Sequence, residues 1–129
     1  MIVLDASAAV RVLLGLPPTD RIRERLDEPG ESLHAPHVFD LEVLNTLRRH
    51  LERASEERAG EAFEMLQELD ISLYPHEPVR ERIWALRANL TAYDAVYVAL
   101  AETLAAPLVT TDSKLAKAPG VVAEVEVFA

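Results

Sequence analysis

Cysteine is missing from this 129-residue sequence, and long apolar runs are missing as well. Without cysteine the chain can form no disulfide, no cysteine-ligated zinc site and no thiol nucleophile, so oxygen or histidine ligands must hold any metal. No apolar run approaches the roughly 20 residues of a membrane-spanning helix, and no charged start followed by a short apolar stretch suggests a signal peptide. We therefore expect a cytoplasmic protein without a membrane partner.

Glycine and positive charge are scarce too. The four glycines form no G-x-G-x-x-G pattern after a strand, which argues against a dinucleotide-binding loop. Thirteen basic against 22 acidic residues leave a net charge of -9, whereas phosphate binding normally draws on a positive surface. Most of the cations are arginine, which suits bidentate phosphate contacts, but they are mixed with glutamate as on a solvated helix face. A nucleic-acid path therefore stays open for three arginine clusters, at positions 21, 23 and 25, at 48, 49 and 53, and at 80, 82 and 87.

Short apolar segments alternate with helix-forming segments along the chain. We expect strands at residues 1–5, 31–35, 71–74, 108–111 and 121–128, the last at an edge of the sheet. Helices are expected at residues 6–15, 19–28, 37–53, 55–69, 77–88 and 91–104, with a helical turn from residue 112. This alternation predicts a three-layer α/β fold, a central parallel sheet of about five short strands with helices on both faces. A chain of this length holds one core, so residues 1–129 are expected to form a single domain.

Acidic residues follow two of the predicted strands. Asp5 closes the first strand and Asp112 closes the strand at residues 108–111. Ligands of open parallel sheets bind outside the carboxyl ends of the strands, near the point where strand order reverses. Each aspartate could instead be the N-cap of the helix that follows it. Their joint placement favours a shared site.

Asp94 is the only charged residue between Ala92 and Ala101, in the segment AYDAVYVALA. A buried carboxylate without a partner is very costly, so a functional role is a natural explanation for it. The alternative is a capping box, in which Thr91 and Asp94 satisfy the first turn of the helix. The two roles are compatible, because a first-turn acid at a strand-end crevice is also well placed for a metal.

Glu42 lies in a helix that is apolar nearly all round. A helical wheel groups it with Asn45, Thr46 and Arg49 in a polar stripe that could simply face solvent, and Asp40 near the helix start is a local rival. Histidine offers no better site, since no two share a helical face. We interpret the histidines as structural or surface residues, at positions 34, 37, 50 and 76.

Four converging carboxylates would repel one another and raise some of their pKa values. A divalent cation resolves this conflict, and hard oxygen ligands suit Mg²⁺ or Mn²⁺. One or two such ions can activate a water molecule for attack on a phosphodiester. Hydrolysis would then need no protein nucleophile.

The chain resembles the PIN-domain endoribonucleases, and within them the VapC-type toxins, from Met1 to about Phe128. The resemblance rests on four segments, IVLDASA with Asp5 and Ser7, FDLEVLNTL with Glu42 and Asn45, LTAYDAVYVALAE with Asp94, and LVTTDSKLAKA with Asp112. None of these motifs is specific alone. Their order, at these strand and helix positions, makes the combination fairly specific.

This resemblance implies a PIN fold and Mg²⁺- or Mn²⁺-dependent cleavage of RNA by a toxin of a type II toxin–antitoxin system. The implied catalytic and metal-binding residues are Asp5, Glu42, Asp94 and Asp112, with Ser7, Asn45, Thr111 and Ser113 as supporting polar residues. Some PIN domains carry a further acid just after the last of these aspartates, where this chain has Ser113 and Lys114, so one or two ions remain possible. The resemblance also implies a homodimer that a small antitoxin protein silences.

Other functions fit the same architecture. A phosphatase of the haloacid dehalogenase type needs a second aspartate two residues after the first, where Ser7 stands here. A receiver-type signalling module needs an aspartate at the end of the third strand, where this chain has Tyr74 and Pro75. A PIN-like binding domain that has lost catalysis fits every residue pattern described above and stays open.

Overall fold

The strands of the computed structural model, which describes residues 1–129 apart from the side chain of Leu51, form one parallel sheet. The order in the sheet is β3-β2-β1-β4-β5, and all four strand pairings are parallel. The strands are β1 (Ile2–Leu4), β2 (Leu33–Pro36), β3 (Ile71–Tyr74), β4 (Leu108–Thr110) and β5 (Val125–Val127). The predicted parallel sheet is confirmed, with β5 at its edge.

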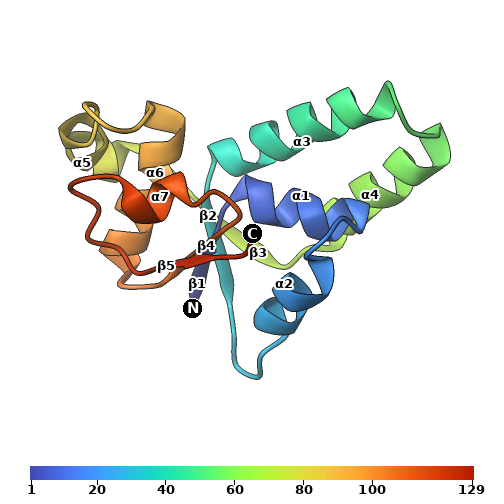
Figure 1. Cartoon of the computed structure of the whole chain (residues 1–129), viewed down its shortest axis with the longest axis horizontal. Coiled ribbons are helices and arrows are strands. Elements are labelled where there is room, and N and C mark those ends of the chain that lie inside the picture. Colours follow the sequence, from blue (N-terminus) through green and yellow to red (C-terminus); the bar gives the residue numbers. More distant parts are fainter.

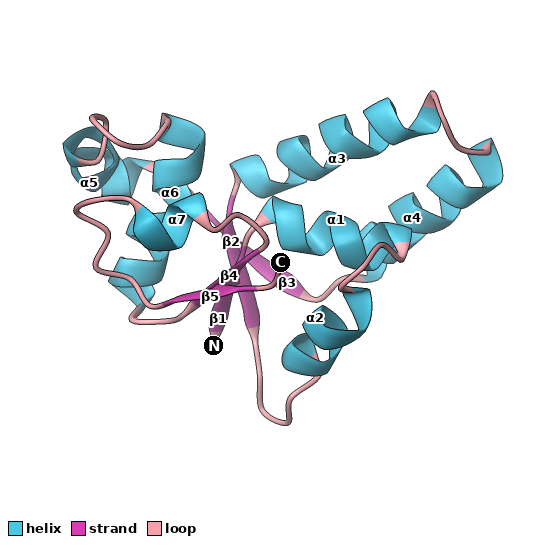
Figure 2. Cartoon of the chain, in the orientation of Figure 1, coloured by secondary structure: helices cyan, strands magenta, loops and turns pink.

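Helices cover the sheet from both sides (Figure 1). One group consists of α1 (Ala6–Leu14), α2 (Thr19–Leu26), α3 (Val38–Leu51) and α4 (Glu56–Glu68). The other group consists of the 3-10 helix η1 (Glu77–Val79) and the helices α5 (Arg80–Ala85), α6 (Ala92–Leu104) and α7 (Lys114–Lys117). Figure 2 shows the strands between the two groups, which confirms the three-layer α/β fold. No helix in the described chain is both long enough and apolar enough to span a membrane.

The strand order reverses between β1 and β4. The chain moves outward from β1 to β2 and β3, and then returns to the other side of β1 with β4. Leu4 pairs with Val109, and the backbone N–H of Asp5 donates to the Val109 carbonyl at 2.9 Å. The residues that follow β1 and β4 therefore meet at the carboxyl edge of the sheet, where open α/β folds bind their ligands.

The core explains two of the most apolar segments. Ile2, Val3 and Leu4 are fully buried, as expected for a central strand with helices on both faces. In α6 every residue from Ala95 to Ala101 is buried, so the middle of the helix lies within the core, while Ala92 and Tyr93 at its start are exposed. Gly15 ends α1 in the left-handed conformation, at φ 64°, which a glycine adopts without a steric penalty.

Two predicted elements are shorter in the structure. The helix expected at residues 77–88 is divided into η1 and the six-residue α5, which ends at Ala85. The strand expected at residues 121–128 forms only over Val125–Val127, because its partner β4 offers just three residues for pairing. Neither difference changes the topology of the sheet.

Candidate active site

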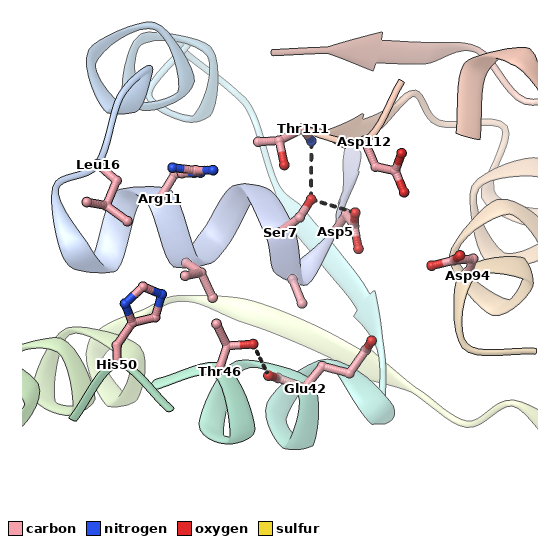
Figure 3. A pocket seen from close by; sticks show the side chains of 12 residues that line it. Asp5, Ser7, Arg11, Leu16, Glu42, Thr46, His50, Asp94, Thr111 and Asp112 are labelled. Carbon is pink, nitrogen blue, oxygen red and sulfur yellow. Dashed lines mark hydrogen bonds between the residues drawn. The ribbon is translucent and has the colours of Figure 1, made fainter. Parts of the chain in front are cut away.

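A cavity of about 370 Å³ lies at the carboxyl edge of the sheet, where the chain leaves β1 and β4 (Figure 3). Side chains from five parts of the chain line it, namely the β1–α1 junction, the later part of α1 with Leu16, α3, α6 and the β4–α7 loop. All four acids proposed from the sequence are among them: Asp5, Glu42, Asp94 and Asp112. The fold thus brings together residues that are more than 100 positions apart.

Asp5 is the most buried of these acids, with 9% of its surface exposed. Its Oδ2 accepts hydrogen bonds from Ser7 Oγ at 2.7 Å and from Thr110 Oγ1 at 2.6 Å. Burial raises the pKa of Asp5 above its ordinary value, the two hydroxyls partly offset that rise, and the charges of Asp94 and Asp112 add to it. Asp5 is the N-cap residue of α1, but its carboxylate makes no capping bond, so the prediction that this side chain caps the helix is wrong.

Hydroxyl groups connect the two loops that carry Asp5 and Asp112. Ser7 Oγ accepts the backbone N–H of Thr111 at 3.2 Å, and Thr110 Oγ1 accepts the backbone N–H of Asp112 at 3.0 Å. The two hydroxyl oxygens are 3.3 Å apart. Because Thr110 is fully buried, this network holds both aspartate-bearing loops in a fixed relation.

Glu42 reaches the cavity from α3 and is half-buried. Its Oε1 accepts a hydrogen bond from the hydroxyl of Tyr97 at 2.7 Å. Burial raises the pKa of Glu42, the Tyr97 hydroxyl lowers it, and the nearby charges of Asp5 and Asp94 raise it further. One turn along α3, Thr46 also lines the cavity and donates to the Glu42 carbonyl at 2.9 Å.

Asp94 lies in the first turn of α6 and also at the cavity. Its backbone N–H donates to Thr91 Oγ1 at 3.2 Å, which confirms that Thr91 caps α6. Its carboxylate lines the cavity. Asp112 is similar, since its Oδ1 accepts the backbone N–H of Lys114 at 2.9 Å while the residue also lines the cavity.

Lys114 places a positive charge between two of the acids. Its Nζ lies 3.2 Å from Asp94 Oδ2 and 3.9 Å from Asp112 Oδ2. The hydrogen-bonded Asp94 raises the pKa of Lys114, so the ammonium stays charged. This side chain is exposed and flexible, and it partly neutralises the carboxylates from the solvent side.

The supporting polar residues separate into two pairs. Ser7 and Thr111 line the cavity beside the acids. Asn45 and Ser113 are exposed and do not line it: Asn45 accepts a hydrogen bond from Arg48, and Ser113 is the N-cap residue of α7. The structure therefore offers no direct contact through which Asn45 or Ser113 would orient a carboxylate.

Sequence reasoning missed two positioning residues, Thr110 and Tyr97. Each presents a hydroxyl from within an apolar segment, and each donates it to a cavity carboxylate. Tyr97 also follows Asp94 by three positions, a spacing that places both on one helical face. The signal that could have identified them is a hydroxyl residue in an apolar segment, close in sequence to a candidate acid. Arg11 and His50, which line the far end of the cavity, were also missed as site residues.

The donor chemistry of the cavity fits a hard divalent cation. Four carboxylates face one cavity, and two of them raise the pKa of a third, so negative charge is concentrated there. Among the described residues, no three acidic or histidine side chains already surround one point closely enough to ligate an ion. Mg²⁺ typically takes one or two carboxylates and keeps several waters, so these residues fit it with water completing the shell.

A family model for the PIN domain matches residues 2–121, which is most of the chain. The chain belongs to the PIN-domain family. This PIN domain is 43% identical to Ribonuclease VapC1 of Mycobacterium tuberculosis over 127 residues, covering 96% of this chain and 95% of the relative. It is 40% identical to Ribonuclease VapC12 of the same species over 131 residues, covering all of both chains. The resemblance to the VapC proteins is thereby confirmed.

Solved structures agree on the fold of this PIN domain. A toxin-antitoxin complex from Klebsiella pneumoniae matches with a TM-score of 0.72 at 15% identity, covering 100% of this chain and 98% of the other. At such low identity the match shows the shared fold alone. Membership in the PIN-domain family argues against the haloacid dehalogenase alternative, because that phosphatase type belongs to another family.

Proposed function

We propose that this PIN domain is an Mg²⁺- or Mn²⁺-dependent endoribonuclease. The observation that carries the proposal is the convergence of four carboxylates, Asp5, Glu42, Asp94 and Asp112, on one cavity at the point where strand order reverses. Two relatives at about 40% identity are named ribonucleases, which supports RNA as the substrate. The reaction would be hydrolysis, in which water attacks phosphorus and the bond to the leaving oxygen breaks.

Asp5, Asp94 and Asp112, with Glu42 at the edge, would hold the ion or the waters around it. When bound, a divalent ion supplies polarisation of the phosphodiester and a more acidic attacking water. Asp5 is kept in one orientation by the hydroxyls of Ser7 and Thr110, which leaves its Oδ1 to face the cavity.

Glu42 is suited to take the proton of the attacking water. Its pKa is raised by burial, which brings it closer to the working pH and makes the carboxylate a stronger base. Tyr97 engages Oε1 of Glu42, so Oε2 is the oxygen that remains for the water. Lys114, beside Asp94 and Asp112, offers a positive charge for a phosphate oxygen once a cation has replaced it at the carboxylates.

Cleavage of a labelled single-stranded RNA by the purified protein tests the proposal. We expect cleavage that depends on added Mn²⁺ or Mg²⁺, disappears with EDTA and is lost in Glu42→Gln. Asp40→Asn is the matched control, because Asp40 lies on the same helix and does not line the cavity. If RNA binds the wild-type protein but stays intact at every metal concentration, the binding-only alternative is correct.

We further propose that the ribonuclease is a toxin restrained by a small antitoxin protein. The relatives carry VapC names, and a solved structure of the same fold is a toxin-antitoxin complex. A groove between α3 and α4, lined by Leu44, Leu47 and Phe63, exposes apolar surface that a partner's side chains would cover. Expression of the chain alone should slow growth, and co-expression with a neighbouring antitoxin gene should restore it. Normal growth on expression of an RNA-cleaving chain would refute the toxin role.

A homodimer is the assembly that we propose for this PIN domain. Apolar side chains around a second groove are largely exposed, including Leu41 at 69% and Tyr93 at 64%, and the nearby Trp84 at 67%. Burying such residues against a second copy would be strongly favourable. Light scattering should give twice the chain mass, and Tyr93→Ser should shift the protein toward monomer. A wild-type protein that stays monomeric at all concentrations would exclude this assembly.

A further inference from the structure

The candidate active-site cavity has two ends of opposite charge. The carboxylates occupy one end, and Arg11 and His50 line the other, with Thr46 between them (Figure 3). Arg11 lies in the last turn of α1 and His50 near the end of α3, and both are exposed. The cavity is therefore not a uniformly acidic metal pocket.

The basic end continues beyond this cavity. A neighbouring hollow of about 360 Å³ is lined by Thr46, Arg49, His50, Glu52 and Arg53. Thr46 and His50 line both hollows, so the two form one groove along α3. From Glu42 to Leu51 the helix α3 advances by about 14 Å at 1.5 Å per residue. One stacked nucleotide occupies roughly 3.4 Å along a strand, so the groove is long enough for more than one nucleotide.

Two arginines elsewhere are paired with carboxylates within the fold. Arg25 is paired with Glu31 and Glu126, and Arg82 is paired with Glu102. In the described part of the chain, no carboxylate lies within ion-pair distance of the three groove arginines, Arg11, Arg49 and Arg53. Positive charge without an internal partner thus collects beside the carboxylates, on a chain of net charge -9.

We propose that Arg11, Arg49, His50 and Arg53 form a phosphate-binding groove that holds one flank of a single-stranded RNA next to the bond to be cleaved. The proposal rests on the ribonuclease function argued above. Guanidinium groups match phosphate in shape and charge, and a basic groove that follows the backbone is the usual way to bind single strands without reading their sequence. The groove directs the strand along α3, away from α6.

The geometry also assigns different tasks to the two ends. The carboxylate end repels phosphate unless a cation is bound, whereas the basic end attracts it with or without the cation. RNA binding should therefore survive removal of the divalent ion, while cleavage should not. The groove residues act on binding and positioning, so their loss should raise KM with little change in kcat.

Fluorescence anisotropy with a short labelled single-stranded RNA, in EDTA, tests the groove directly. Arg11→Gln and Arg53→Gln should each weaken binding about tenfold and reduce the salt slope of log K by about 0.7 per lost phosphate contact. Arg48→Gln is the matched control, because Arg48 lies on α3, lines the hollow beside α4 instead and contacts Asn45. Circular dichroism and the Mn²⁺ affinity should stay unchanged in all three variants.

The possible outcomes distinguish this proposal from the proposed function. If the wild type cleaves RNA while Arg11→Gln and Arg53→Gln bind it as Arg48→Gln does, the groove is refuted and the ribonuclease stands. If the variants keep RNA binding but lose capture of the co-expressed antitoxin, the groove is an antitoxin surface and the proposal is overturned. If the wild type neither binds nor cleaves RNA, the ribonuclease itself fails.

Discussion

Replacing Thr110 by valine removes one hydroxyl from the centre of the site and keeps the shape of the side chain almost unchanged. Thr110 is fully buried at the end of β4, and Val has nearly the same shape. The hydroxyl donates to Asp5 Oδ2 at 2.6 Å and accepts the Asp112 N–H at 3.0 Å. Thr110→Val therefore breaks both hydrogen bonds that connect the two aspartates through this side chain.

The expected loss of stability follows from these two contacts. The hydrogen bond to the Asp5 carboxylate contributes about 1.5–3 kcal/mol and the bond from the Asp112 N–H about 0.5–1.5 kcal/mol, while the added buried methyl group returns about 0.8 kcal/mol. The free energy of unfolding at pH 7 should thus fall by about 1–4 kcal/mol, which lowers Tm by roughly 4–15 °C.

The pH dependence gives a sharper test of the Thr110→Val variant. Burial already raises the pKa of Asp5, and loss of the donor raises it further. A raised carboxyl pKa means that the folded state binds the proton more tightly than the unfolded state, so stability falls as pH rises from the unfolded to the folded pKa. The variant should be most destabilised above the folded pKa and least in acid, where Asp5 is protonated in both states.

Urea denaturation at several pH values and Mn²⁺ titration calorimetry measure both effects. Thr110→Ser is the matched control, because it keeps the hydroxyl and loses only a methyl group. The serine variant should retain wild-type Mn²⁺ affinity, whereas the valine variant should bind Mn²⁺ more weakly and require a higher pH. Equal losses in the two variants would show that Thr110 matters for packing alone.

Three further predictions concern the carboxylates and their partners. Mn²⁺ at about 100 times its Kd should raise the free energy of unfolding by about 2.7 kcal/mol, a gain that Asp94→Asn should reduce; an unchanged melting curve would contradict the metal site. Tyr97→Phe removes a donor that lowers the pKa of Glu42, so the acid limb of the pH–rate profile should move to higher pH; an unmoved limb excludes Glu42 as the titrating base. Lys114→Gln removes a cation that lies 3.2 Å from Asp94, so calorimetry should show tighter Mn²⁺ binding, and weaker binding would mean that Lys114 organises the site instead.

The acids at strand ends were predictable because their placement depends on local patterns. An apolar run followed by an aspartate marks the end of a buried strand, and parallel topology brings such ends to one edge of the sheet. Asp5 and Asp112 satisfy this rule. Thr110 ends β4 at the same edge, but a threonine within a strand is ordinary, and only the register of β1 against β4 shows that its hydroxyl reaches Asp5.

The polar stripe on α3 shows where sequence reasoning stops. At about 100° per residue, Asn45 lies about 60° to one side of Glu42 and Thr46 about 40° to the other. A helical wheel cannot say which side faces the cavity, because that depends on how α3 packs against α1 and the sheet. In the structure Thr46 lines the cavity and Asn45 is exposed. The packing of α3 against distant parts of the chain determines which side faces the cavity, and no local sequence pattern encodes that packing.

Net charge is a weak guide to nucleic-acid binding in a protein of this design. Exposed charges farther apart than a Debye length, about 8 Å at physiological salt, barely affect one another, so a phosphate responds mainly to its immediate neighbours. Some acids are neutralised inside the fold, as Glu31 and Glu126 are by Arg25, and others gather at the cavity where a cation is required. The groove arginines keep their charge for an outside partner. Cation binding at one end and phosphate binding at the other therefore support each other, because each ligand reduces the electrostatic cost of placing the other in the same cavity.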